Sequence, residues 1–167
     1  DVGRWLIKDT EAAGSRRYLA AIDSFPPRYR RLIEAGTAPR LERWKRLREA
    51  TEQDHHFAPA WFALGDERFH RGPLAGYLRR DALEPLQRAT VLRPDFAPAW
   101  EHRAWVSIAE GDSADARRAM VEFQRTSWSQ DLFTGFTGTL LRVGFEWRFT
   151  SQTEAEALTR YVLGQPM

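Results

Sequence analysis

The histidines are the first residues of this sequence whose chemistry could suggest a site. His55 and His56 are adjacent, while His70 and His102 stand alone elsewhere in the chain. A zinc site calls for two histidines one helical turn apart or for a cluster of cysteine and histidine. Neither pattern occurs, and the chain has no cysteine. The sequence therefore predicts no metal site, no disulfide and no thiol catalysis.

Other patterns of catalytic residues are missing as well. The carboxylates are numerous, but no pair stands in an apolar setting that would shift a pKa. Gly135, Gly138 and Gly144 are not spaced like a phosphate-binding loop, and no Gly-Lys-Ser, Gly-Lys-Thr or Gly-x-Ser-x-Gly sequence occurs. We therefore predict that this chain is not an enzyme and binds no cofactor.

One five-residue sequence, called the duplicated phrase below, occurs twice in the middle of the chain. Phe57-Ala-Pro-Ala-Trp61 returns as Phe96-Ala-Pro-Ala-Trp100, 39 positions later. The similarity extends backwards, because Leu47-Arg-Glu-Ala-Thr51 precedes the first copy as Leu86-Gln-Arg-Ala-Thr90 precedes the second. Self-similarity at a fixed period of this length is the sequence sign of a repeat array.

Residues 58–72 resemble the first helix of a tetratricopeptide repeat (TPR). The family pattern is a Trp followed by Leu-Gly, then an aromatic residue, then a Gly at the turn. The residues that fit it are Trp61, Leu64, Gly65, Phe69 and Gly72. Residues 81–95 resemble the second helix, with small residues at Ala82 and Ala89 and a terminating Pro94. The family period is near 34 residues, so residues 72–78 carry an insertion of about five.

The following unit fits the family pattern less closely. The positions that agree are Trp100, Ala104, Gly111, Asp112 and Ala116. Arg103 stands where the pattern has Leu, Phe123 where it has Ala, and Trp128 where it has Pro. The clear repeats are thus 57–95 and 96–127. The resemblance implies an all-α fold over residues 14–167, a right-handed superhelical array of about four antiparallel helix pairs.

Proline and glycine mark the helix ends expected before these repeats. Residues 1–13 are either a linker or an N-terminal helix. A helix that begins at Gly14-Ser15 should stop at Pro26-Pro27, because proline disfavours the helical conformation in the residue before it. The next helix should run from Pro27 to Ala35, with Gly36 as its C-terminal cap.

A further helix is expected from Arg40 to about Gln53, opened by Pro39. Within the repeats, Pro59 and Pro98 should lie in first helical turns, as should Pro85 if Asp81 caps its helix. Gly111-Asp112 reads as a helix stop followed directly by a helix cap.

The last part of the chain carries two competing patterns. A strand pattern of alternating apolar residues is formed by Leu141, Val143, Phe145, Trp147 and Phe149. A helical stripe is formed by Leu132, Phe136, Leu140, Val143 and Trp147. An isolated strand would have no partner in a helical array, so we prefer the helix. Ser151-Gln-Thr-Glu154 is a capping-box pattern that should open a last helix, ending at Gly164.

A repeat array offers an extended concave surface for binding. In the TPR family the first helix of each pair lines that surface. The resemblance therefore places on it Phe62, Asp66, Phe69 and His70 of one repeat, and Glu101, Trp105 and Ile108 of the next. The alternative for Phe69 and Ile108 is packing against neighbouring residues. Family members that clamp a peptide's terminal carboxylate have Lys and Asn here, so a basic or apolar peptide is the better expectation.

Positive charge is concentrated before the repeats. Residues 28–48 hold seven Arg and one Lys against Glu34 and Glu42, although the net charge of the whole chain is only +2. With Tyr29 and Trp44 interleaved, this stretch could bind nucleic acid or an acidic partner. The alternative is a solvated helix face, and we regard nucleic acid as the less favoured partner.

The function that these features favour is a protein–protein interaction or scaffolding module. Gly72-Pro-Leu-Ala-Gly76 after a Phe-rich helix is similar to repeat regions of bacterial signalling proteins, which implies a regulatory part of a larger, cytoplasmic protein. No apolar run approaches the length of a membrane span, so no membrane insertion is expected. Self-association into a homodimer is an alternative, since an array can expose apolar helix faces at its ends.

Overall fold

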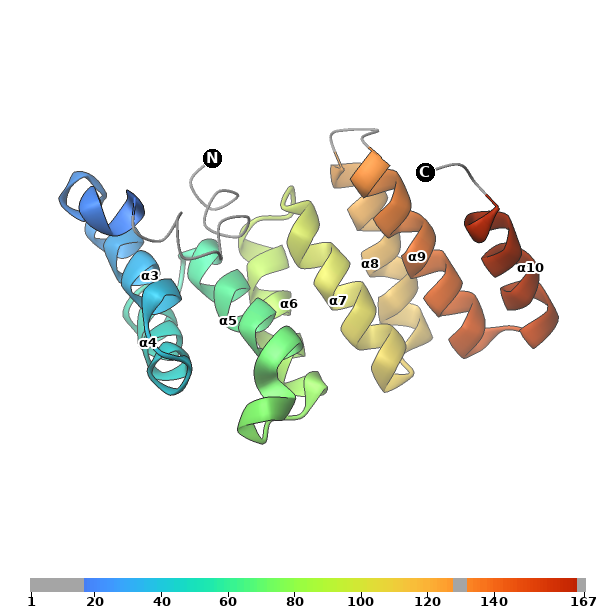
Figure 1. The fold of residues 1–167 in the computed structure, drawn as a ribbon, viewed down its shortest axis with the longest axis horizontal. Coiled ribbons are helices and arrows are strands. Elements are labelled where there is room, and N and C mark those ends of the chain that lie inside the picture. The colour runs from blue at the N-terminus through green and yellow to red at the C-terminus, as the bar shows by residue number, and fades with distance from the viewer. Residues whose placement is uncertain (1–16, 128–131, 165–167) are drawn as a thin grey trace. The chain divides into compact units, whose positions relative to one another are not determined.

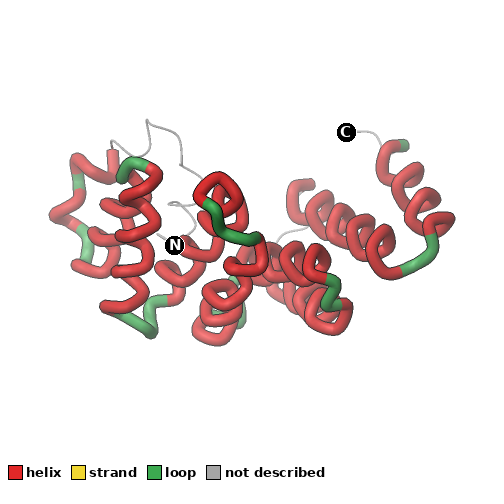
Figure 2. The backbone as a smooth tube through the Cα atoms, turned by 90° about the horizontal axis from the view of Figure 1, so that it is seen from below, coloured by secondary structure: helices red, strands yellow, loops and turns green. Residues whose placement is uncertain are grey.

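The computed structural model of this chain describes residues 17–127 and 132–164. Within these ranges, the side chains at 40–41, 132–134, 155 and 162 are not described. All regular structure in the described ranges is helical, with no strand (Figures 1 and 2). The predicted all-α fold is therefore confirmed, while residues 1–13 and Trp128 lie outside the described residues. None of the described helices has the length and apolar character needed to cross a membrane.

The chain divides into two compact units, Asp1–Leu92 and Arg93–Met167. The described elements of the first unit, after the helical residues 17–20, are η1 (Ile22–Ser24), α3 (Pro27–Thr37), α4 (Arg40–Gln53), α5 (Ala58–Arg71), η2 (Gly72–Ala75), η3 (Arg79–Ala82) and α6 (Leu83–Leu92). Each α-helix packs on the next one along the chain. The core between α3, α4 and α5 is formed by Leu32, Ala35, Leu47, Ala50, Phe57, Ala60 and Leu64.

The end of α3 differs from the prediction. The helix continues to Thr37, so Gly36 lies inside it and is not its C-terminal cap. The chain leaves the helix at Ala38, whose backbone is extended (φ −68°, ψ 154°) because Pro39 follows it. The hydroxyl of Thr37 donates to the carbonyl of Ile33 at 2.9 Å and satisfies one carbonyl of the last turn. The predicted start and end of α4 are confirmed.

The junction between α4 and α5 contains the first copy of the duplicated phrase. Phe57 is the N-cap of α5 (φ −91°, ψ 87°), and its N–H donates to the carbonyl of Asp54 at 3.1 Å. The indole N–H of Trp61 donates to the carbonyl of His55 at 3.0 Å. One turn earlier, the Thr51 hydroxyl donates to the carbonyl of Arg48 at 2.7 Å.

The junction between α6 and α7 (Ala97–Glu110) repeats this geometry 39 positions later. Phe96 is the N-cap of α7 (φ −94°, ψ 87°), and its N–H donates to the carbonyl of Arg93 at 3.1 Å. The indole N–H of Trp100 donates to the carbonyl of Pro94 at 2.9 Å. The Thr90 hydroxyl donates to the carbonyl of Gln87 at 2.9 Å. The duplicated sequence thus forms the same N-cap conformation and the same local hydrogen bonds twice.

The helix pair that follows the first junction is closely packed. Gly65 of α5 lies against Leu86 of α6, where an added Cβ would come within 2.7 Å of the Leu86 Cγ. Ala82 and Ala89 are fully buried, as expected for small residues where two helices approach closely. Pro85 lies in the first turn of α6, but Asp81 does not cap that helix; its carboxylate accepts the N–H of Leu78, the N-cap of η3, instead.

The second unit is also helical throughout its described part. Its elements are α7, α8 (Ser113–Thr126), α9 (Leu132–Phe149) and α10 (Gln152–Leu163). Helix α7 packs on α8, α9 packs on both, and α10 packs on α9. The core is formed by Trp100, Ala104, Ile108, Ala116, Ala119, Phe123, Leu141 and Phe145.

The predicted stop and cap between α7 and α8 are confirmed. Gly111 has φ +84°, a left-handed conformation that glycine adopts without steric cost, and the Asp112 carboxylate accepts the N–H of Asp115 at 2.9 Å. Residues 132–149 form a helix, as preferred over the strand. At the start of α10, the N–H of Glu154 donates to the Ser151 hydroxyl at 3.3 Å, which is one half of the predicted capping box.

Candidate interaction surfaces

The C-terminal half of α5 brings three of the predicted binding residues together. Asp66 and His70 lie one turn apart, with the Asp66 Oδ1 at 3.5 Å from the His70 Nε2. The His70 side chain is half exposed and that of Asp66 is 23% exposed. The Phe69 ring meets the His70 ring edge to face at 4.9 Å, and the Arg79 guanidinium lies 5.3 Å from the Phe69 ring centroid. This half of α5 therefore offers a carboxylate, an imidazole and an aromatic ring within two turns.

Phe62, the fourth residue predicted on this helix, is buried. Only 1% of its surface is exposed. A partner could not contact the ring without displacing the residues that cover it, so Phe62 is a poor choice of contact residue. Helical register gives the direction of a side chain but not what lies over it, which is why the sequence alone could not show this burial.

The predicted binding residues of α7 also include both partly exposed and buried side chains. Glu101 remains partly exposed, at 21% of its side chain. Trp105 is half-buried against the core of the second unit, and a Cβ added to Gly144 of α9 would lie only 2.8 Å from the Trp105 ring. Ile108 is 6% exposed and is part of that core. Ile108 therefore packs within its own unit, the alternative considered for it from the sequence.

A buried ionic network lies between α7 and α8. It was not predicted from the sequence. Arg103 donates from Nε to Asp115 Oδ2 at 2.9 Å, and the Ser107 hydroxyl donates to the same oxygen at 2.7 Å. Arg118, whose side chain is exposed to solvent, donates to Asp115 Oδ1. The exposed fraction is 9% for the Arg103 side chain and 6% for that of Asp115. Arg103, which departs from the family pattern, is thus the buried partner of a buried carboxylate.

This network shifts the titration of Asp115. Burial by itself raises the pKa of the carboxyl, but the hydrogen bonds from Arg103, Arg118 and Ser107 outweigh it and hold the pKa of Asp115 well below its usual range. The sequence analysis considered only pairs of carboxylates in apolar settings, and the single carboxylate of Asp115 between two arginines was not predicted. The available signal was a charged residue, Arg103, within an otherwise apolar stripe of α7.

The basic stretch 28–48 is largely neutralised by neighbouring groups. Exposed ion pairs one turn apart join Lys45 to Glu49, Arg46 to Glu42 and Arg48 to Glu52. Two further arginines make internal contacts. Arg30 donates to the carbonyls of Asp23 and Phe25, and Arg43 pairs with the buried Glu67 of α5 at 3.4 Å. The cations of this stretch therefore do not form a continuous row without counter-charges.

The chain matches no known family model, no curated protein and no solved structure.

Proposed function

We propose that this chain is a TPR-like interaction module that binds a partner protein or peptide. The observation that carries this proposal is the helix–loop–helix junction that occurs twice. Both copies use a Phe N-cap, a Trp indole bonded to the carbonyl six positions before it and a Thr hydroxyl bonded to the carbonyl three positions before it. A junction repeated at a fixed spacing is expected of a repeat protein, whose use is to present a binding surface.

In this proposal the helix pairs follow the right-handed superhelical arrangement of the TPR family. Helix α5 pairs with α6 and α7 with α8, and α5 and α7 would be the first helices that line the concave face. The module would serve as a regulatory or scaffolding part of a larger bacterial signalling protein, in keeping with the resemblance of residues 72–76 to such regions.

The best-supported contact residues are those whose side chains are at least partly exposed. Asp66 and His70 on α5 and Glu101 on α7 meet this condition. Phe69 adds an aromatic surface next to His70, and aromatic residues are favoured anchors in protein interfaces. The carboxylate of Asp66 suits a basic partner, with the apolar part of the ligand against Phe69.

The proposal is tested by affinity capture of partners with the wild-type chain and with an Asp66→Ala, His70→Ala double variant. The control is Val91→Ser, a change at an exposed position of α6. A protein that survives nuclease treatment, is lost with the double variant and is retained by the control would support the proposal. The captured protein is then purified and its affinity for all three chains measured. Equal affinity for the three would contradict binding at this surface.

A further inference from the structure

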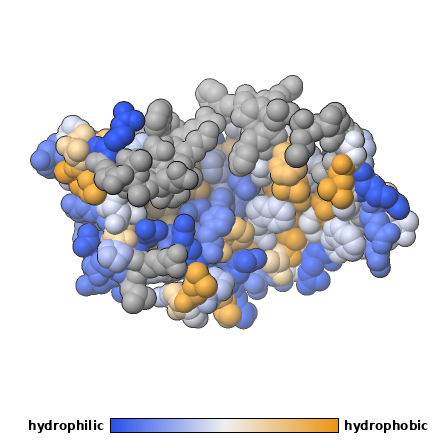
Figure 3. All heavy atoms as spheres, in the orientation of Figure 1, coloured by the Kyte–Doolittle hydropathy of each residue, from blue (hydrophilic) through white to orange (hydrophobic). Residues whose placement is uncertain are grey.

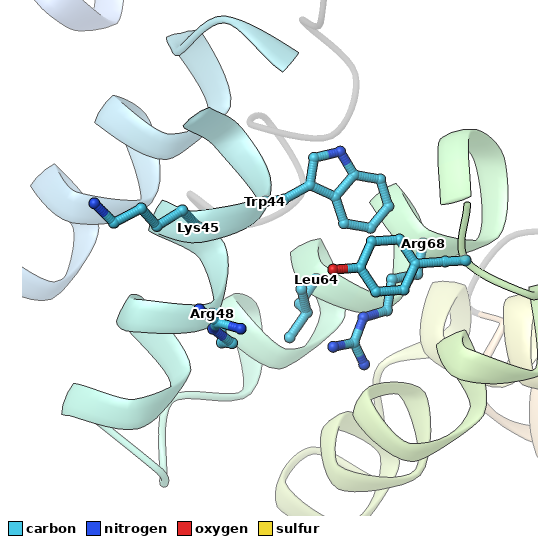
Figure 4. Close-up of a pocket in the computed structure, with 6 residues that line it drawn as sticks. Trp44, Lys45, Arg48, Leu64 and Arg68 are labelled. Carbon is cyan, nitrogen blue, oxygen red and sulfur yellow. The ribbon is translucent and has the colours of Figure 1, made fainter. Parts of the chain in front are cut away.

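A pocket lies in the first unit between α4, α5 and the segment that joins α5 to α6 (Figure 4). Its volume is about 190 Å³. The residues that line it are Trp44, Lys45, Arg48, Leu64, Arg68 and Tyr77. None of the binding residues expected from the repeat pattern is among them, so the pocket is distinct from the surface proposed above.

One wall of the pocket is a stacked aromatic pair. The rings of Trp44 and Tyr77 lie 5.0 Å apart between centroids and are inclined by only 8°. Tyr77 belongs to the insertion in the repeat pattern, where Gly76 turns the chain with φ +81° and the N–H of Tyr77 donates to the carbonyl of Gly72 at 3.0 Å. The insertion thus places the Tyr77 ring, in the connection between α5 and α6, against the Trp44 ring of α4.

Two guanidinium groups line the same pocket. Arg48 projects from α4 with 60% of its side chain exposed. Arg68 of α5 donates to the carbonyl of Asp81 at 3.0 Å and lies 5.8 Å from the Tyr77 ring, so its position is held from two sides. Its buried Nε donates to no group in the described part of the chain. Figure 4 shows Lys45 pointing away from Leu64 and Arg68, so Lys45 contributes its aliphatic stem.

The carboxylates nearest these two arginines are weakly engaged. Arg48 lies 3.6 Å from Glu52, and Arg68 lies 3.8 Å from Glu84, whose side chain is 65% exposed. Long ion pairs with solvent-exposed glutamates contribute little to stability, so an incoming anion can replace them readily. Guanidinium groups bind carboxylates through paired hydrogen bonds, and the stacked rings offer an apolar surface beside them.

We propose that this pocket binds an acidic segment of a partner protein. A carboxylate of the segment is held by Arg48 and Arg68, and an adjacent apolar side chain packs against Trp44 and Tyr77. A protein segment fits better than a nucleic-acid strand, because Arg46 does not line the pocket and Lys45 points away from it, which leaves two guanidinium groups and no row of cations for successive phosphates.

The experiment uses the full chain and a short fluorescent peptide of glutamates around a central phenylalanine. Fluorescence anisotropy should show salt-sensitive binding that is weakened at least about tenfold by Arg48→Glu. Arg46→Glu is the matched control, because it makes the same charge change on the same helix outside the pocket. Tyr77→Ala should weaken binding of this peptide. The same substitution should not change the binding of a second peptide in which glycine replaces the phenylalanine. Circular dichroism checks that each variant is folded.

Several outcomes would overturn the proposal. If Arg48→Glu and Arg46→Glu weaken the affinity for the peptide equally, the binding depends on the overall charge of α4 and not on the pocket. Inorganic phosphate that competes as well as the peptide would make the site a simple anion site, and tighter, Arg48-dependent binding of polyuridine would make it a nucleic-acid site. The Asp66→Ala, His70→Ala variant should bind the peptide like the wild type, so failure of this proposal and failure of the proposed function are separable.

Discussion

The environment of Asp115 differs from that of an ordinary surface carboxylate. Its carboxylate is buried between α7 and α8 and accepts hydrogen bonds from Arg103, Ser107 and Arg118. A buried ion pair of this kind adds little net stability over an apolar pair, but the loss of one partner leaves a charge without compensation. The contribution of Arg103 to the stability of the fold therefore depends on the presence of Asp115.

We expect Arg103→Leu to destabilise the protein. The loss should be about 3 kcal/mol, because Asp115 stays charged and loses its buried cation. The double variant Arg103→Leu, Asp115→Leu should be destabilised by less than the sum of the two single variants. Urea unfolding followed by circular dichroism measures all four chains. Strictly additive losses would show that the two side chains do not act as a pair.

The titration of Asp115 predicts a pH dependence of stability. Its pKa is lower in the folded state than its ordinary value of 3.8, so its stabilising effect is fully present above that value and declines as the pH falls below it. The difference in free energy of unfolding between the wild type and Asp115→Asn should therefore narrow as the pH falls from about 4 to about 2. A difference that stays constant over this range would contradict the assignment.

At the scale of the elements, close helix packing and helix ends decide where glycine is needed. Gly65 is needed because α6 lies directly against it, with the Leu86 side chain and backbone nitrogen at 2.7 Å and 3.3 Å from an added Cβ. Gly36 has no such neighbour and has no positive φ. The two glycines therefore have opposite roles, although both lie within helices of the same unit.

We expect Gly65→Ala to destabilise the protein by roughly 1–3 kcal/mol, because α5 and α6 must separate or Leu86 must change its rotamer. Gly36→Ala should instead stabilise it by about 0.4–1 kcal/mol, since alanine loses less backbone entropy on folding and meets nothing. Thermal and urea unfolding of both variants test the pair. A stabilised Gly65→Ala would mean that the contact with Leu86 is not close in solution.

At the scale of the whole molecule, each unit has a core of its own. Leu47 is 2% exposed in the core of the first unit, and Leu141 is 1% exposed in that of the second. The residues of each core come from that unit alone. A cavity in one core should therefore act first on the unit that contains it.

We expect Leu141→Ala to lower the hydrogen-exchange protection of α7, α8 and α9 by about 2–5 kcal/mol, with a smaller effect on α3 and α4. Leu47→Ala is the matched variant and should show the reverse distribution. Mass spectrometry of peptides after hydrogen exchange separates the two units. Uniform loss of protection along the chain in both variants would show a single cooperative unit.

The sequence by itself determined the helical fold and most helix boundaries of this protein. The repeated phrase, the prolines in first turns and the Gly111-Asp112 pair are local signals, and a helix end depends mainly on local backbone geometry. The helix over 132–149 was preferred correctly, because a strand needs a partner that no other part of the sequence offered. The exceptions were Gly36, where Pro39 set the helix end instead, and the helix expected to reach Pro26, whose α-helical part ends at residue 20.

Only the tertiary structure decided which side chains lie on a surface and which do not. Phe62 and Ile108 have the register of binding residues, yet both are buried. Arg103 and Asp115 are 12 positions apart and meet only because α7 and α8 pack together. The pocket at Trp44 likewise joins α4, α5 and the insertion. Burial and contacts between helices depend on residues far apart in the chain, and periodicity along one helix does not contain that information.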